Sequence, residues 1–372
     1  MAEHPQFRFR LLDRFDREAK AAGDLRLKRI ALAKRAGAIA RLSRFDEARK
    51  EIAALRACNV DYEPRLSAWI LFAEGLVDHF QSLSLGAGDK FRRTLAIGLG
   101  TGDRDLIAAA SAWLANSEFI RGNYLSAASH LSAAFQSAAP TDDASMARAS
   151  LVVADALSWA GDSRTAVGWY QRARERAIQE GDIAMQSVIL FNAAAFKVAR
   201  LVEMDCLSSR SEHETRAAAM NLDSVANLDF GLGIQALGAM IPILRAEVKT
   251  VQRLWVDAIA LFDAHAETAA REGQSRLLPK FLAERAYCKA QCGSDSEAMS
   301  EVLETVASLD QCSDLDDLFI LHSRVSFTYR LLGEVAKADE HLEVSARCLA
   351  SFKVQQQQML DAILPVIRDL NV

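Results

Sequence analysis

The fold of this chain is decided by residues 115–134, which read ANSEFIRGNYLSAASHLSAA. A small residue, Ala115, precedes Gly122 by seven positions, and Ala127 then precedes the large apolar Leu131 by one helical turn. Small residues let two helices approach closely, and glycine permits the left-handed backbone conformation that ends a helix. The stretch therefore predicts two helices joined by a tight turn.

The same pattern recurs along the chain at intervals near 40 residues. Alanines follow one another at spacings of 39, 40, 39, 52, 40, 40 and 40 residues, and a large apolar residue stands four positions after each. A small residue stands twelve positions before seven of them, and glycines fall five before or fifteen after several. Two periodicities in one phase predict stacked helical hairpins. The alanines, termed anchors below, are Ala48, Ala87, Ala127, Ala166, Ala218, Ala258, Ala298 and Ala338.

The composition supports an all-α fold. Of 372 residues, 65 are alanine, the strongest helix former, whereas only 18 are glycine and 6 are proline. So few helix breakers leave little room for the many turns of a β-sandwich. With 51% hydrophobic and 25% charged residues, the chain is expected to fold and to bury a core.

The quoted stretch resembles the tetratricopeptide repeat, and similar stretches occur at 154–173 and 326–342. The resemblance covers roughly residues 29–351 as eight units. Because the period near 40 exceeds the family's usual length of about 34, the chain is more similar to the helical sensor domains of bacterial signal-responsive regulators. The resemblance implies an all-α, right-handed superhelical solenoid of about eight hairpins with capping helices at both ends.

The register divides the chain into three segments. We expect a basic N-terminal capping helix over 1–28, the repeat array over 29–351 and a C-terminal capping helix over 352–372. The spacing of 52 places about 12 extra residues near 202–213, as a loop that reaches over a groove or as longer helices. Turns are predicted near 43–45, 82–84, 122–124, 161–163, 253–255, 293–295 and 333–335, with a late turn in the fifth hairpin.

The charge distribution bounds the partners. The net charge of −5 argues against a dedicated nucleic-acid binder. Residues 1–56 carry 15 Lys and Arg against 8 Asp and Glu, whereas residues 294–320 carry 8 Asp and Glu and neither Lys nor Arg. These segments form solvated helix faces or, alternatively, docking edges.

The compartment is expected to be the cytoplasm. No secretion signal is expected, because mixed charges run from Arg8 to Lys20 without an apolar core. No membrane span is expected either, since the apolar stretch Phe230 to Leu244 is short and interrupted. Six cysteines, mostly within helical patterns, are typical of free thiols in a reducing compartment.

Catalytic motifs are weak. The glycine-rich run from Gly98 to Gly102 follows a helical pattern and not a strand, so we expect it to end a hairpin. None of the 7 histidines stands in an HExxH pattern or beside a cysteine pair that would complete a metal site. We therefore expect no enzyme, no cofactor and no metal.

The resemblance implies that the first helix of each hairpin lines a concave groove, at positions 18, 15, 14, 11, 8 and 7 before the anchor. Three of the 5 tryptophans fall there, which favours a peptide ligand, and short amides suit hydrogen bonds to its backbone. Alternatively, the aromatic residues pack between hairpins. Leu76, Ile120, Val152 and Phe191 also fall on these positions. The predicted binding residues are Trp69, Phe72, His79, Phe80, Trp113, Asn116, Phe119, Arg148, Asp155, Trp159 and Asn192.

The sequence thus predicts a non-enzymatic scaffold that binds a protein or peptide in its groove, in a bacterial regulator or sensor. One alternative is a structural adaptor that assembles a complex through its convex face or its acidic edge. Another is an enzyme with a site in the fifth-repeat insertion. No membrane and no direct nucleic-acid partner is expected.

Overall fold

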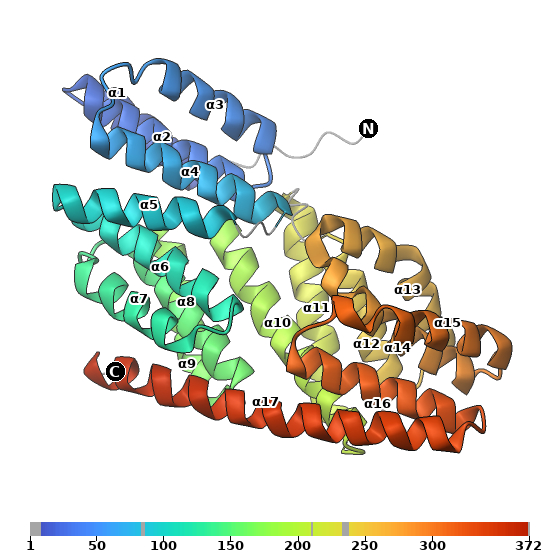
Figure 1. Cartoon of the computed structure of the whole chain (residues 1–372). Coiled ribbons are helices and arrows are strands. Elements are labelled where there is room, and N and C mark those ends of the chain that lie inside the picture. The colour runs from blue at the N-terminus through green and yellow to red at the C-terminus, as the bar shows by residue number, and fades with distance from the viewer. Residues whose placement is uncertain (1–8, 83–85, 210, 233–237, 371–372) are drawn as a thin grey trace. The chain divides into compact units, whose positions relative to one another are not determined.

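The computed structural model of the chain describes residues 9–82, 86–209, 211–232 and 238–370 (Figure 1). Throughout these ranges the regular secondary structure is helical and no strand occurs, which confirms the prediction of an all-α chain. The α-helices are α1 (Arg10–Ala21), α2 (Leu25–Arg41), α3 (Phe45–Ala57), α4 (Pro64–Ser82), α5 (Gly86–Thr101), α6 (Arg104–Ile120), α7 (Tyr124–Ser137), α8 (Asp143–Trp159), α9 (Ser163–Glu180), α10 (Ile183–Cys206), α11 (Glu212–Leu232), α12 (Met240–Val251), α13 (Trp255–Ala269), α14 (Leu278–Gln291), α15 (Asp295–Ala307), α16 (Leu315–Leu331) and α17 (Val335–Asp369).

The chain forms two compact units. Helices α10, α11 and α17 each contribute residues to both units, and the other helices belong to one unit only. Unit 1 comprises Met1–Leu190, Asp229–Ala236 and Gln358–Val372, and unit 2 comprises Phe191–Leu228 and Leu237–Gln357.

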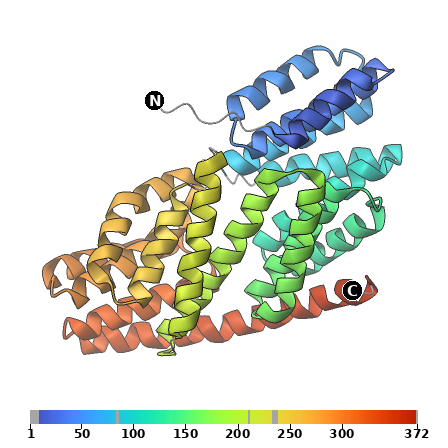
Figure 2. The same ribbon diagram turned by 180° about the vertical axis from the view of Figure 1, so that it is seen from behind.

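Consecutive helices pair as hairpins within each unit. In unit 1, α2 packs on α3, α4 on α5, α6 on α7 and α8 on α9, and the first helices of successive hairpins also contact one another. In unit 2, α12 packs on α13 and α14 on α15, while α14 also packs on α16. Figures 1 and 2 show α2 and α3, drawn in blue, as an antiparallel pair from both sides. Paired, neighbouring helices follow from the short turns that the register predicts.

The turns lie where the periodicity places them, and they share one hydrogen-bond pattern. Before α7, the amide of Gly122 donates to the carbonyl of Phe119 (3.0 Å), and that of Asn123 donates to the carbonyl of Glu118 (2.9 Å). This pair of bonds closes a helix end with a left-handed residue. The same pattern recurs at Gly161, Gly293 and Gly333, all with positive φ, whereas the turn predicted at 82–84 lies partly outside the described residues.

Two hairpins make this turn without glycine. Ser43 and Arg253 stand five positions before their anchors and have φ of 62° and 65°. Their amides donate to the carbonyls of Ala40 and Thr250, as the glycines do in the other hairpins. Position in the hairpin, and not the residue type, therefore imposes the left-handed conformation.

The small positions bring the helices into close contact. All eight anchors are buried, as are the small residues twelve positions before seven of them. A Cβ atom added to Gly75 would stand 2.6 Å from the ring of Phe91, so this position accepts no side chain without rearrangement. Six of the eight large partners are buried. Tyr170 is partly buried, and Leu342 is 43% exposed.

The extra residues of the fifth hairpin lengthen its helices. Helix α10 has 24 residues and α11 has 21, whereas α8 has 17. The turn between α10 and α11 again has a left-handed residue, Ser208 (φ 58°), whose amide donates to the carbonyl of Asp205. This turn falls later than the regular spacing places it. The alternative of longer helices therefore holds over that of a long loop.

The two ends differ in how they are built. Helix α1 is a separate helix that packs on α2, and residues 1–8 lie outside the described residues. The expected C-terminal capping helix over 352–372 does not begin anew, because residues 352–369 continue α17, a single helix of 35 residues, and residues 371–372 lie outside the described residues. Within unit 1, the end of this helix packs Met359 and Ile363 into the core of α6, α7, α8 and α9.

Helix α10 also bears on the membrane prediction. Among the described residues it is the one helix whose length and mean hydropathy (1.3) would suffice for a span, and 39% of that window is buried in the structure. The sequence reading had considered only Phe230 to Leu244, part of which lies outside the described residues. One such helix is weak evidence for a membrane, since a core helix of a folded protein meets the same criteria.

Candidate functional site

Unit 1 contains a pocket of about 320 Å³ between its hairpins, termed the Arg148 pocket below. Most of its wall comes from helices α2, α4, α6 and α8, the first helices of four successive hairpins. Helix α1 adds Arg14, Phe15 and Glu18, and the connection between α7 and α8 adds Ala139, Thr141 and Asp142. Glu180 and Met185 complete the lining. The volume lies near the lower end of small-molecule sites.

The apolar part of the wall is aromatic. Trp69, Phe72, Leu76 and Trp113 line the pocket, and the two tryptophans are each 6% exposed. Trp113 is fixed by ring contacts with Phe91, at a centroid distance of 5.6 Å, and with two further aromatic side chains of α4. These rings are rigid parts of the unit 1 core that also face the pocket.

Most of the charged groups around the pocket are paired. Arg14 donates two hydrogen bonds to Glu180, at 2.7 and 2.5 Å, and Lys34 lies 3.7 Å from Asp105. Arg41 pairs with Asp182, the residue that caps the N-terminus of α10 through a hydrogen bond from the amide of Met185. These ion pairs join helices that are distant in the sequence, and they leave little net charge.

Arg148 differs from these paired groups. Its side chain is buried, with 4% of the residue exposed, and its guanidinium lies over the ring of Trp113 at 3.9 Å. Across the described part of the chain, no carboxylate or carbonyl oxygen pairs with it, and its buried Nε has no hydrogen-bond partner. Burial lowers the pKa of Arg148 to about 10, and nearby Arg41 also lowers it, while Asp155 opposes the shift. The side chain therefore remains a cation at neutral pH.

The lining carboxylate Asp142 caps the N-terminus of α8. Asp142 accepts a hydrogen bond from the amide of Ser145 at 3.1 Å, which satisfies one free donor at the start of α8. Burial raises the pKa of Asp142, and Asp105 nearby raises it further. A second negative charge in this part of the pocket is thus unfavourable.

Ten lining residues stand on the positions that the register assigns to the groove. The sequence reading had identified Trp69, Phe72, Leu76, Trp113 and Arg148 among them. It did not apply the same offsets to the first hairpin, where they give Lys34, Gly37 and Arg41, nor take Ala109 and Ala112 from the third. The offsets from the anchors therefore identify these lining residues from the sequence alone. The contribution of α1, Glu180 and Met185 follows only from the tertiary structure.

The other predicted binding residues do not line this pocket. His79 and Phe80 pack against Trp113, at centroid distances of 5.0 and 5.6 Å, and Asn116 is buried. Phe119 and Trp159 form a separate aromatic pair at 6.1 Å.

Two predicted polar residues have other surroundings. Asp155 is buried and accepts a hydrogen bond from the hydroxyl of Tyr170 at 2.8 Å. Asn192 belongs to unit 2. The structure therefore brings four of the eleven predicted binding residues together around the pocket.

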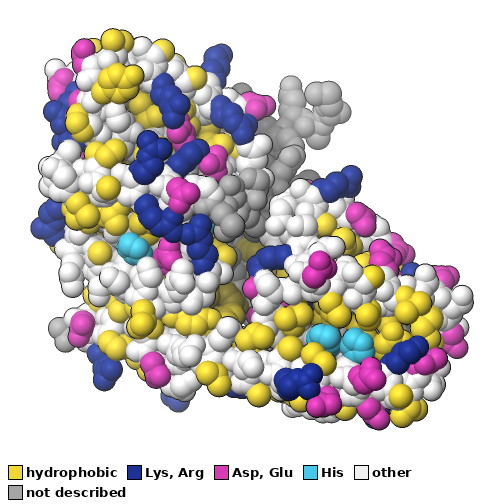
Figure 3. Space-filling view, viewed as in Figure 1, with side chains coloured by type: hydrophobic (Ala, Val, Ile, Leu, Met, Phe, Trp, Pro, Cys, Tyr) yellow, Lys and Arg dark blue, Asp and Glu magenta, His cyan; other side chains and the backbone are white. Residues whose placement is uncertain are grey.

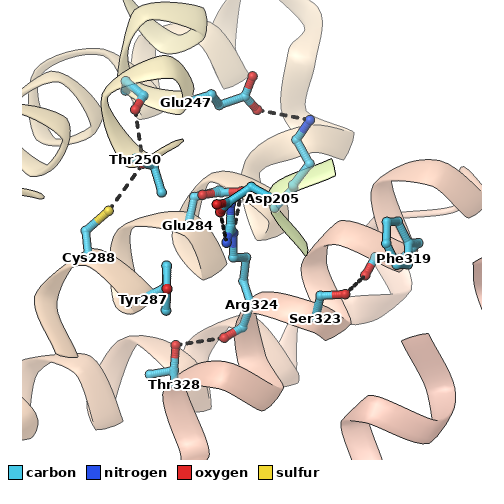
Figure 4. Close-up of polar contacts among 12 residues, drawn as sticks. Asp205, Glu247, Thr250, Glu284, Tyr287, Cys288, Phe319, Ser323, Arg324 and Thr328 are labelled. Carbon is cyan, nitrogen blue, oxygen red and sulfur yellow. Dashed lines mark hydrogen bonds and ion pairs between the residues drawn. The ribbon is translucent and has the colours of Figure 1, made fainter. Parts of the chain in front are cut away.

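Unit 2 has a buried charged cluster, which Figure 4 shows in close-up. Arg324 of α16 donates to Glu284 of α14 (2.9 Å) and to Asp205 of α10 (2.8 Å), and all three side chains are fully buried. Arg253 donates to the other oxygen of Asp205 at 2.9 Å. These ion pairs join α10, α14 and α16. The cluster is therefore explained as a structural part of the core of unit 2.

A second buried cation lies beside this cluster. The ammonium of Lys280 lies 3.1 Å from Glu247 and 3.0 Å from Asp317. These two carboxylates raise the pKa of Lys280 against the effect of burial. The charge of this lysine is therefore balanced by two carboxylates of the core.

The surface charges follow the sequence. Figure 3 shows Lys and Arg side chains gathered over the N-terminal helices, and Asp and Glu side chains over the region of α15 and α16. No group of three or more His, Cys, Asp or Glu suitable for a metal ion occurs in the part of the chain that was searched.

Comparison with known proteins gives no assignment. No protein-family model matches the chain, and no curated protein matches its sequence. The function is therefore argued from the Arg148 pocket.

Proposed function

We propose that this protein is a non-enzymatic helical-repeat scaffold of the regulatory or sensor type, which binds a protein or peptide segment in the Arg148 pocket. The observation that carries the proposal is the convergence of one face of four successive hairpins on a single pocket. That pocket combines rigid aromatic walls with one buried arginine, Arg148, that has no carboxylate bonded to it among the described residues. Rigid aromatic residues and arginine are the side chains that most often dominate binding energy.

The larger-scale features of the proposal rest on the repeat pattern. The even spacing of the anchors and the recurring turns support a right-handed superhelical solenoid, in which the pocket occupies the concave face. The free cysteines are consistent with a cytoplasmic protein. Ligand binding between hairpins would change their packing angles, which is how such a scaffold transmits a signal.

The test reduces the volume of the pocket and keeps its aromatic and charged side chains. A peptide display library is selected on the parent protein, and the selected peptides are measured on Ala109→Leu, which adds a side chain to the pocket wall. We expect at least about tenfold weaker binding. The control is Ala53→Leu, the same change on the exposed surface of α3.

The outcome also distinguishes the alternatives. Peptides that bind Ala109→Leu as tightly as the parent would contradict the proposal. If those peptides are basic and lose affinity when acidic residues of α15 such as Glu297 are replaced, the protein is an adaptor that binds through its acidic edge. Melting temperatures of both variants within a few degrees of the parent show that the comparison concerns binding and not folding.

A further inference from the structure

We propose that the Arg148 pocket binds a small free organic acid, in which a single carboxylate is attached to an apolar body. The inference rests on the proposed function, because it uses the same pocket, and it specifies the ligand that the pocket accepts. Four observations on the described residues support it.

The first observation is the unpaired guanidinium. Burying a cation without a partner is costly, and buried arginines are normally matched by carboxylates. Arg148 is 4% exposed, faces the pocket and has no such partner among the described residues. A planar guanidinium binds a carboxylate with two parallel hydrogen bonds. The carboxylate of a bound acid would therefore be the partner that Arg148 lacks among the described residues.

The second observation is the orientation of Arg148. Its guanidinium lies over the Trp113 ring at 3.9 Å, which holds the plane of the group and keeps its charge. Lys34 of the first hairpin is similarly placed, because its ammonium lies 4.4 Å from the centroid of the Trp69 ring. Lys34, however, also has a carboxylate partner, since an oxygen of Asp105 lies 3.7 Å from the ammonium. Among the described cations that line the pocket, Arg148 is therefore the one without a hydrogen-bonded or ion-paired carboxylate.

The third observation limits the charge of the ligand. Glu18, Asp105, Asp142 and Glu180 also line the pocket, and its other cations already have carboxylate partners, so a second added negative charge would meet no further unpaired cation among the described lining residues. A carboxylate brings one charge, whereas a phosphate monoester brings nearly two at neutral pH. The pocket thus favours a carboxylate over a phosphate.

The fourth observation concerns size and surface. The pocket holds about 320 Å³, and Trp69, Phe72 and Leu76 face it beside Arg148. Helix α1 closes one side with Arg14, whose two hydrogen bonds to Glu180 hold that wall in place. Such a space has room for one small apolar molecule.

The experiment titrates the full chain with matched probes and follows tryptophan fluorescence and calorimetric heat. The probes are phenylacetate, hexanoate, phenylacetamide, phenyl phosphate, and a tetrapeptide Ala-Ala-Ala-Phe with a free or an amidated C-terminus. We expect phenylacetate or hexanoate to bind with Kd below about 1 mM, and phenylacetamide at least about tenfold more weakly. Phenyl phosphate and both peptides are expected to bind more weakly than phenylacetate.

Variants assign the binding to Arg148. Arg148→Met retains much of the side-chain length and removes the charge, and we expect at least a tenfold loss of phenylacetate affinity. Arg148→Lys keeps the charge but loses the planar pair of donors, and we expect a smaller loss. The matched control is Arg172→Met, since Arg172 also stacks on a tryptophan (Trp169, 5.0 Å) but lies outside the pocket.

Each result has a defined reading. No acid binding below about 1 mM, or equal affinity for phenylacetate and phenylacetamide, overturns the inference, and this second comparison needs no variant to fold. Tighter binding of the free-acid peptide than of phenylacetate overturns the small-molecule assignment but supports the proposed function. If display peptides depend on Ala109 while no acid binds, the inference alone fails. If neither binds at the pocket, both fail.

Discussion

Two buried arginines, Arg324 of α16 in unit 2 and Arg148 of α8 in unit 1, have opposite surroundings. Arg324 is fully buried and pairs with Glu284 and Asp205. Arg148 is 4% exposed and has a tryptophan face beneath it in place of a carboxylate. Burial alone therefore does not distinguish a structural ion from a binding group, whereas the presence of partners does.

The same difference separates the two units. In unit 2 the buried charged side chains of the core form ion pairs with one another, and these pairs join α10, α14 and α16. In unit 1 the core packing is aromatic and small-residue, and one charge faces a cavity instead of a partner. The first arrangement joins helices of the core, and under the proposal made above the second keeps a cation available for a ligand at some cost in stability.

The largest expected effect is on Arg324. Arg324→Met leaves Glu284 and Asp205 buried with less compensation, so we expect the free energy of unfolding of unit 2 to fall by about 3–5 kcal/mol. Native-state hydrogen exchange at the amides of α14 and α16 measures it.

The control for this prediction is an ion pair at the surface. Arg330 pairs with Asp339, and the two side chains are 54% and 62% exposed. Arg330→Met should change the free energy of unfolding by less than about 1 kcal/mol. A loss in Arg324→Met as small as that of the control would show that the buried cluster contributes little to unit 2.

Arg148→Met should have the opposite effect on unit 1. The change removes a buried charge that lacks a carboxylate partner, and it loses only the stacking on Trp113. We expect the free energy of unfolding of unit 1 to be unchanged or up to about 2 kcal/mol higher, measured by exchange at the amides of α6 and α8. A loss of more than about 2 kcal/mol would place Arg148 in the core, as Arg324 is.

The third prediction uses a histidine that lies against Trp113. Burial lowers the pKa of His79 to about 3, and the charge of Arg148 contributes to the shift. Between the ordinary value of about 6.5 and pH 3, the unfolded chain takes up a proton that the folded chain does not. Stability from His79 is therefore complete above about pH 6.5 and decreases as the pH falls through this window.

The measurement is the pH dependence of unit 1 stability. A full proton corresponds to a slope of at most about 1.4 kcal/mol per pH unit, and partial exposure of His79 reduces it. His79→Gln should flatten this slope between pH 6 and 4. Arg148→Met should raise the pKa of His79, which NMR titration detects, because one repelling charge is removed. An unchanged slope in His79→Gln would contradict the assignment.

The local rules of the fold were predictable from the sequence. Small residues at fixed spacing and glycine at the turns predicted the hairpins, because both act through contacts within one repeat. The division into two units and the continuous α17 were not predictable in this way. Both depend on packing between distant segments, such as Met359 against the core of α6, α7, α8 and α9.

The candidate site was predictable in part for the same reason. Offsets from the anchors found Trp69, Trp113 and Arg148, since these depend only on the face of one helix. They could not show that Arg148 lacks a partner, because that depends on which carboxylates other helices bring near. Asp182, for example, pairs with Arg41, although 141 positions separate the two residues in the chain.

The smallest expected effects concern the turns, where the two units can be compared directly. Gly293 in unit 2 has a φ of 76°, and an added Cβ would meet no atom within 4 Å. Gly293→Ala therefore tests the backbone conformation alone, and we expect a loss of about 1 kcal/mol. The equivalent residue in unit 1 is Ser43, with a φ of 62° and a buried hydroxyl that has no hydrogen-bond partner.

Ser43→Gly should accordingly increase the stability of unit 1 by up to about 1 kcal/mol, because glycine adopts this conformation without strain and no polar group remains buried. Urea unfolding of the two variants and the parent, followed by circular dichroism, measures both changes. Opposite signs are required by a common turn geometry. If Ser43→Gly were destabilising, the serine would have to contribute an interaction that the glycine turns lack, and the equivalence of the hairpins in the two units would not hold at this position.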